Sequence, residues 1–105
     1  KHKLKLGSVK VFGDMKQPVK RLAVSPGSGK SAIAPAVSKG ADVLVTGDIG
    51  HHEGLDAAAQ GVSVIDAGHY GTEYIFMEDM KERLAKAFPE LTVSCAKVRS
   101  PYTIL

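Results

Sequence analysis

The sequence is poor in several residue types, and each scarcity excludes a class of protein. Cys95 is the only cysteine, so an internal disulfide bond and a cysteine-based zinc site are both excluded. Tryptophan is absent and aromatic residues make up 6% of the chain, so the core must be aliphatic. No apolar run approaches the roughly 18 residues that a membrane span needs, and no signal peptide opens the sequence. We therefore expect a cytoplasmic protein with no membrane partner.

The chain also carries little excess charge. Much of the net charge of +3 lies in the first residues, KHKLK, which are typical of a solvated chain end. Since no aromatic residues are interleaved with the basic ones, we predict no nucleic-acid partner. The remaining composition, with 44% hydrophobic and 24% charged residues, is ordinary for a globular α/β protein. The length predicts one domain over residues 1–105, and the start on Lys1 rather than Met predicts a piece of a longer protein.

Strand-like segments alternate with helical ones, and glycines separate them. The strand-like segments are rich in β-branched residues and fall at residues 8–13, 19–26, 41–47, 62–68 and 91–98. The helical segments fall at residues 31–40, 51–61 and 71–88. This alternation is typical of βαβ units. It predicts a single α/β domain with a mostly parallel or mixed sheet of about five strands, flanked by three helices.

Four details of this arrangement can be tested against a structure. The turn-like residues 14–18 predict a hairpin between the first two strands, and the continuous apolar run 41–47 predicts a central strand covered on both faces. The helix over residues 71–88 carries an apolar stripe at helical spacing and is closed by a proline. The stripe consists of Ile75, Phe76, Met80, Leu84, Ala87 and Phe88. Residues 100–105 are predicted to be an extended tail.

Three polar segments each follow a strand and lead into a helix. They are SPGSGKS (25–31), TGDIGHH (46–52) and DAGHYGTE (66–73). Because ligands gather at the carboxyl ends of the strands in α/β sheets, we expect the chemistry of the chain at this one edge.

The first segment ends like a phosphate-binding P-loop, but its spacing is wrong. That motif requires a glycine five positions before the glycine that precedes its lysine. Here that glycine is Gly29, and Val24 occupies the required position. The segment is better explained as a sharp strand-to-helix turn in which Gly27 and Gly29 adopt positive φ. Lys30 is then a candidate rim cation for an anionic substrate, because a helix start attracts anions weakly.

The third segment carries the clearest candidate site. His69 and Glu73 are four residues apart, so they lie on one face of a helix and can share a metal ion. An imidazole and a carboxylate suit zinc, iron, manganese or cobalt. The alternative is a histidine at a helix start beside an exposed glutamate. In the second segment, Asp48 and His52 are candidates to line the site, and Asp48 could instead cap the following helix.

The order GSG, DVLVTGDI, then VIDAGHYGTE resembles the C-terminal part of the Nif-three-like dinuclear metal proteins, a family that carries the name GTP cyclohydrolase 1 type 2 homologue. The resemblance runs from about Val9 to the end of the chain, where SPYT also matches. It implies a two-lobed protein that forms ring-like homo-oligomers, with two metal ions bound between its α/β halves. It also assigns the ligands of the GHxxxE motif to His69 and Glu73.

The resemblance further implies that part of the site is missing from this chain. The N-terminal half of the family supplies a His-His pair and an aspartate, and this chain has no counterpart for that segment. The expected partner is therefore the missing N-terminal half, and the metal centre is incomplete here. The implied function is a metal-dependent hydrolase acting on a small nucleotide-like substrate, with Asp48 or His52 orienting water or substrate. The alternative is a non-catalytic module that binds metal or another protein.

Overall fold

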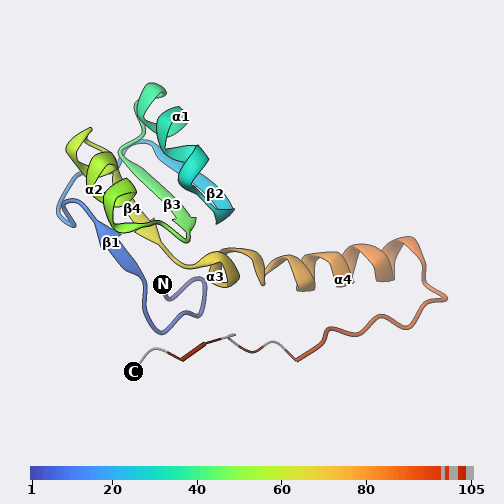
Figure 1. Ribbon diagram of the computed structural model, residues 1–105. Helices are drawn as coiled ribbons and strands as arrows, with labels where there is room; N and C mark the ends of the chain where they lie inside the picture. Colours follow the sequence, from blue (N-terminus) through green and yellow to red (C-terminus); the bar gives the residue numbers. More distant parts are fainter. Residues whose placement is uncertain (98, 100–101, 104–105) are drawn as a thin grey trace.

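The computed structural model describes residues 1–97, 99 and 102–103. Its four strands are β1 (Lys10–Phe12), β2 (Leu22–Ser28), β3 (Val43–Gly47) and β4 (Ser63–Asp66). They form one sheet in the order β1-β4-β3-β2 (Figure 1). Neighbouring strands β2, β3 and β4 are parallel, whereas β1 is antiparallel to β4. The predicted mixed α/β sheet is confirmed, with four strands in the described residues rather than about five.

The helices lie where the sequence pattern placed them, with one division. They are a 3-10 turn η1 (Lys30–Ala32), α1 (Ile33–Ser38), α2 (His51–Ala59), α3 (His69–Glu73) and α4 (Phe76–Ala87). The long helix predicted from residue 71 begins at His69 and is divided into α3 and α4. Tyr74 and Ile75 keep right-handed helical backbone angles at the junction. The hydrogen bond there tightens to a three-residue step, from Met77 N–H to the Tyr74 carbonyl.

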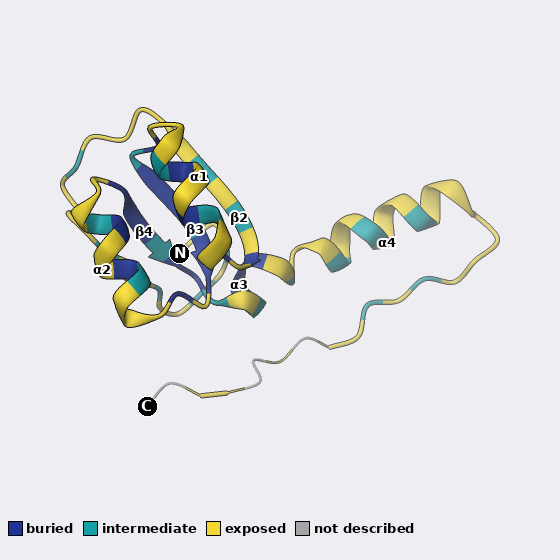
Figure 2. Cartoon of the chain, turned by 45° about the horizontal axis from the view of Figure 1, so that its top comes forward, coloured by how far each residue is buried: buried dark blue, intermediate teal, exposed yellow. Residues whose placement is uncertain are grey.

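The register of the sheet gives it one covered face and one open face. The covered row aligns Ala23, Leu44, Val64 and Phe12 across the four strands. These side chains pack with residues of α1 and α2, and Figure 2 shows the buried positions under those helices. Leu44 is 1% exposed, so its truncation to alanine would cost about 2–5 kcal/mol.

The opposite face aligns Val24, Val45, Ile65 and Val11. Val24 and Val11 are exposed, and the other two are half-buried. Strand β3 is therefore central, as predicted, but the helices that cross between the parallel strands cover it on one face. Four of the five β3 residues are nevertheless buried and Val45 is half-buried, so the prediction of a covered central strand is confirmed for β3 except at Val45.

The predicted hairpin is also wrong. Strands β1 and β2 lie at opposite edges of the sheet, because β1 pairs with β4. The turn itself forms, since Asp14 accepts a hydrogen bond from the Lys16 N–H at 2.8 Å. Gln17 then bonds with the Gly61 carbonyl and with the Ser63 hydroxyl, which ties this connection to the start of β4. The residues after the turn therefore cross the end of the sheet instead of folding back on β1.

The last predicted strand is not formed in its described part, residues 91–97. Helix α4 extends away from the sheet, so the residues after it have no strand edge within reach (Figure 1). They return in extended form beside α4, where the Cys95 thiol donates to the Met77 carbonyl at 3.5 Å. Val98 and most of the predicted tail over 100–105 lie outside the described residues. Among the helices that the structure describes, none combines the length and apolar character of a membrane span.

Candidate metal centre

The carboxyl ends of β2, β3 and β4 meet at one edge of the sheet, and α3 lies across them. The Thr72 hydroxyl joins α3 to the end of β2, because it accepts a hydrogen bond from the Gly27 N–H at 2.9 Å. The His69 N–H joins α3 to the residue after β3, since it donates to Asp48 Oδ1 at 3.2 Å. The three polar segments of the sequence therefore converge.

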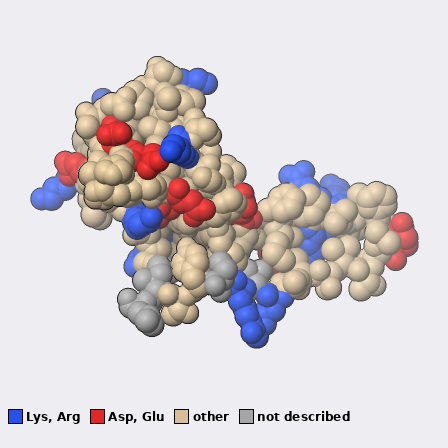
Figure 3. Space-filling view, viewed as in Figure 1, with Lys and Arg blue, Asp and Glu red and all other residues tan. Residues whose placement is uncertain are grey.

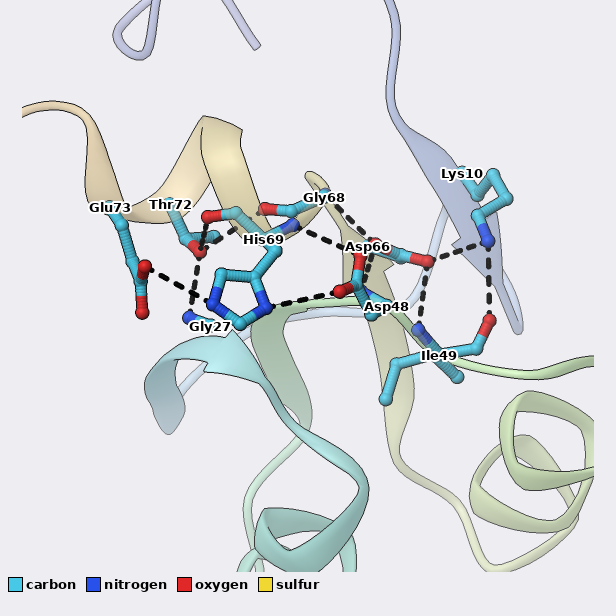
Figure 4. A network of polar contacts seen from close by, with 9 residues as sticks. All are labelled: Lys10, Gly27, Asp48, Ile49, Asp66, Gly68, His69, Thr72 and Glu73. Carbon is cyan, nitrogen blue, oxygen red and sulfur yellow. Dashed lines mark hydrogen bonds and ion pairs between the residues drawn. The ribbon is translucent and has the colours of Figure 1, made fainter. Parts of the chain in front are cut away.

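His69 lies between two carboxylates at this edge (Figure 4). Its Nδ1 is 3.1 Å from Asp48 Oδ2, and its Nε2 is 3.2 Å from Glu73 Oε2. All three side chains are about half exposed, at 51–52%. The carboxylates occupy opposite sides of the imidazole ring, so Asp48 and Glu73 can play different chemical roles.

The His69–Glu73 side of this arrangement fits a divalent metal ion. An ion about 2.1 Å from each of two donor atoms holds those atoms roughly 3.0–3.4 Å apart. The observed separation of Nε2 and Oε2 is 3.2 Å. Asp48 on Nδ1 is the partner that metal-binding histidines usually have on the ring nitrogen facing away from the ion. Within the described residues, no group of three His, Cys, Asp or Glu side chains could hold a metal. The chain thus presents two ligand candidates and one orienting carboxylate.

Two glycines allow the backbones to approach closely enough for this geometry. Gly27 has a φ of +70°, and a Cβ atom there would lie 2.6 Å from Glu73 Oε1 and 3.3 Å from His69 Nε2. At Gly47, a Cβ atom would lie 2.4 Å from the carbonyl carbon of Gly68. The prediction of positive φ is confirmed for Gly27 but wrong for Gly29, whose φ is −97°. Gly29 instead leaves room for the Thr46 side chain.

Asp66 belongs to this network although the sequence patterns did not single it out. It ends β4, its side chain is 1% exposed, and Lys10 Nζ lies 2.7 Å from its Oδ2. Burial alone would raise the pKa of Asp66. The bonds from Lys10 and from the Gly68 and Ile49 N–H groups outweigh burial and hold the pKa below its ordinary value. The available signal was an acidic residue at the end of a buried apolar strand, two positions before the first glycine of the GHxxxE motif.

Lys30 and His52 lie outside the His69 cluster. Lys30 Nζ is 2.6 Å from Glu53 Oε1, and this hydrogen bond raises the pKa of Lys30 and lowers that of Glu53. The His52 ring packs edge-on against His51 with centroids 5.3 Å apart. The roles of Lys30 as a rim cation and of His52 as a residue that lines the site stay predictions.

An open groove of about 1240 Å³ adjoins the cluster. Asp48, His69 and Glu73 lie among its lining residues, and Lys30 and His52 do not. The rest of the lining is mainly apolar and aromatic: Val24, Pro26, Tyr70, Tyr74, Ile75, Phe76, Met77 and Tyr102. In the space-filling view, acidic and basic side chains are interspersed over the α/β part of the molecule (Figure 3). The groove therefore combines a polar end with a long apolar wall.

The fold and this edge define a class: an α/β protein with an incomplete candidate metal site at the carboxyl ends of its parallel strands. Comparison with known protein families and solved structures identifies the family within this class. It belongs to the DUF34/NIF3 family (NGG1p interacting factor 3), whose sequence model matches residues 1–101. The family membership expected from the GSG, TGD and DAGHYGTE motifs is thereby confirmed.

Known relatives are considerably longer than this chain. A Staphylococcus aureus protein named GTP cyclohydrolase 1 type 2 homolog is 47% identical over 88 residues, which make up 84% of this chain and 24% of the relative. The solved S. aureus protein SA1388 is 38% identical with a TM-score of 0.89, over 99% of this chain and 35% of that one. Reduced HcgD from Methanocaldococcus jannaschii is 34% identical with a TM-score of 0.65, over 75% of this chain and 33% of that one. The chain thus spans about a quarter of the curated relatives it matches.

Proposed function

We propose that this chain supplies two ligands, His69 Nε2 and a Glu73 carboxylate oxygen, to a divalent-metal centre in a longer DUF34/NIF3 protein. The observation that carries the proposal is the 3.2 Å separation of these atoms, with Asp48 bonded to the opposite ring nitrogen. A proton on Nδ1, held toward Asp48, leaves the Nε2 lone pair on the side of Glu73. Zinc, iron, manganese and cobalt are the ions that suit this pair.

The other ligands, and a second ion, would come from outside this chain. Two protein ligands are fewer than the three or four of a stable site. The chain accounts for 24% of its curated relative, and its sheet has an open apolar face. We therefore assign the rest of the centre to the N-terminal half of the longer protein, within a homo-oligomer. The single cysteine favours a cytoplasmic location.

The reaction that suits such a centre is hydrolysis of a small nucleotide-like substrate. Bound divalent ions would supply a water of lowered pKa and polarise the bond under attack. The residues of this chain contribute positioning: Asp48 fixes the His69 ring, and the adjoining groove offers Tyr70 and Phe76 to a flat ring. The name GTP cyclohydrolase 1 type 2 homolog, carried by the relatives, supports this substrate class.

A non-catalytic role is the second candidate, and the apolar groove favours it. Ile75, Phe76 and Val24 are between 50% and 66% exposed along the groove, which is more apolar surface than a small polar substrate requires. In that case the metal would have a structural role beside a protein contact.

Zinc titration of the chain by calorimetry tests the metal site. We expect one weak site, lost in His69→Ala and weakened in Glu73→Gln, because each variant removes one of two ligands. Asp48→Asn should lower the affinity about 10- to 100-fold, as loss of an orienting carboxylate does. The matched controls are His51→Ala and Glu78→Gln, which change exposed residues outside the cluster. Zinc binding that follows His51 instead of His69 would contradict the proposal.

A second assay separates the enzyme from the non-catalytic module. GTP and related nucleotides are incubated with metal-loaded longer protein that contains this chain. Turnover that disappears in His69→Ala supports hydrolysis. Zinc binding without turnover across the substrate series supports the non-catalytic role.

A further inference from the structure

The carboxylate of Asp66 is fully engaged by groups from three parts of the chain. Its Oδ1 accepts hydrogen bonds from the Asp48 N–H at 3.0 Å and the Gly68 N–H at 2.9 Å. Its Oδ2 accepts from the Ile49 N–H at 3.1 Å and lies 2.7 Å from Lys10 Nζ. An ionised carboxylate has about four acceptor positions, and all of them are used here.

The three N–H donors belong to the two loops that carry the candidate metal site. Asp48 and Ile49 follow β3, and Gly68 directly precedes His69. Asp48 has a φ of +54°, an uncommon conformation that persists only where the surroundings hold it in place. The bonds to Asp66 from residues 48 and 49 provide that hold.

Two further hydrogen bonds connect the side chain of Asp48 to His69, so the position of Asp48 also determines that of His69. Asp48 Oδ1 accepts from the His69 N–H, and Asp48 Oδ2 contacts His69 Nδ1 at 3.1 Å. A shift of the Asp48 backbone would therefore rotate the imidazole and move Nε2 relative to Glu73. Figure 4 shows this continuous path from Lys10 through Asp66 and Asp48 to His69 and Glu73.

Lys10 supplies the positive charge that a buried carboxylate requires. Strand β1 pairs Lys10 directly with Asp66, and Lys10 Nζ also donates to the Ile49 carbonyl at 3.2 Å. The ammonium thus bonds both the carboxylate and the loop that the carboxylate anchors. Because an unpaired buried charge is strongly unfavourable, the antiparallel strand β1 makes an anionic Asp66 tenable at this position.

We infer that Asp66, with Lys10 as its counterion, is a positioning residue that sets Asp48 and His69 for metal binding. The inference rests on the proposed function, because it assigns to Asp66 and Lys10 the support of the residues that would bind the metal. Asp66 does not act as a ligand. It fixes the backbone of both site-bearing loops, and through them the ring orientation that directs Nε2 toward Glu73.

The test compares Asp66→Asn with a matched control, Asp42→Asn, in the 105-residue chain. Asp42 also accepts two backbone hydrogen bonds, from the Lys20 and Arg21 N–H groups at 2.7 Å, but it precedes β3 at the other end of that strand. Both variants should unfold at lower urea concentration than the parent chain. Only Asp66→Asn should weaken zinc binding, by about 10- to 100-fold in calorimetry. An equal affinity in the two variants would overturn the inference.

A second readout needs no metal, and it can be applied to a milder variant if Asp66→Asn folds poorly. Two-bond ¹H–¹⁵N spectra of the metal-free chain report the protonation of each His69 ring nitrogen. We expect Asp66→Asn and the milder Lys10→Met to change the His69 ring signals, whereas Asp42→Asn leaves them in place. If zinc binds neither this chain nor the longer protein that contains it, but these signals respond, the proposed function fails and the positioning of the His69 ring by Asp66 stands. If zinc binds but neither Asp66→Asn nor Lys10→Met changes the His69 ring signals, the positioning role fails and the proposed function stands.

Discussion

At the scale of single residues, DAGHYGTE combines support and chemistry within one short segment. Asp66 anchors the neighbouring loops, and Gly68, with a φ of +74°, turns the chain from β4 into α3. His69 and Glu73 present the candidate ligands on one face of α3. The Thr72 hydroxyl fixes α3 by accepting from the Gly27 N–H and directing its one proton toward the Gly68 and His69 carbonyls. The ligand candidates are thus held partly by their own segment and partly by bonds to Gly27 and Asp48 from the two neighbouring segments.

Gly27→Ala tests how closely β2 must approach these ligands. Alanine at a φ of +70° costs about 1–2 kcal/mol, and its Cβ would lie 2.6 Å from Glu73 Oε1. We expect a urea midpoint lowered by that free energy and a weaker zinc affinity, because Glu73 must move. Gly61→Ala is the matched control, since Gly61 also has positive φ but open space around it. Loss of zinc affinity in both variants would show that backbone strain, not the contact with Glu73, is responsible.

The sequence could predict the His69–Glu73 pair because helical spacing alone brings side chains four residues apart together. It left open whether Asp48 caps a helix or lines the site. In the structure Gly50 is the N-cap of α2, and Asp48 bonds to His69. Asp66 was missed because its partners are backbone N–H groups, whose identity depends on loop conformation and not on residue type. Spacing rules carry no information about such bonds.

At the scale of elements, the parallel strands and their crossover helices were predictable from the sequence. The strands at the edges of the sheet were not. Continuous apolar runs bounded by glycine identify β3 and β4 whatever their neighbours are. The position of β1 depends instead on which edge accepts it, and residues 8–28 are compatible with a hairpin as well as with the observed separation. Residues 91–97 have strand-like composition, but a strand requires a partner edge, and α4 carries them away from the sheet.

Asp42 joins the starts of β2 and β3, and its ionisation should contribute to acid stability. The Arg21 and Lys20 N–H groups donate to its carboxylate and hold the pKa of Asp42 below its ordinary value. A pKa lowered by folding stabilises the folded state at pH values above the unfolded pKa, about 3.9, and this contribution is lost as pH falls through the folded pKa. Asp42→Asn should therefore lower the urea midpoint at pH 7 and flatten its decline below about pH 4. Parallel pH profiles for variant and parent would contradict this role.

Helix α4 should be the least protected helix of the chain in hydrogen exchange. It has no buried residue, whereas α1 and α2 each bury residues against the sheet. Helical stability in proteins comes mostly from packing of an apolar face, so we expect α4 amides to exchange by local opening and β3 amides only by global unfolding. Mass spectrometry after timed exchange measures the difference. Protection of the α4 amides equal to that of the β3 amides would contradict the expectation, provided that it persists on tenfold dilution, which reduces any contribution from self-association.

At the scale of the whole molecule, three apolar surfaces remain open together. They are the sheet row of Val24, Val45, Ile65 and Val11, the groove wall, and the stripe on α4. The stripe was predicted from its helical period. That period shows that α4 is amphipathic, but it does not show what packs against the stripe, whose residues are half-buried or exposed in the described part of the chain. The relatives are considerably longer than this chain, in line with our proposal that the rest of the metal centre comes from outside it.

The dimensions of the chain give a direct test of this open arrangement. Its Cα radius of gyration is 16.1 Å, whereas a compact chain of this length has about 13 Å. We expect small-angle X-ray scattering, extrapolated to zero concentration, to give a value near the larger figure, since α4 makes few contacts that would fold it back. Phe76→Ser, which changes an exposed residue at the start of α4, should leave the free energy of unfolding within about 0.5 kcal/mol. A radius near 13 Å that increases in Phe76→Ser would instead show that α4 folds over the open face of the sheet, with Phe76 as part of the contact.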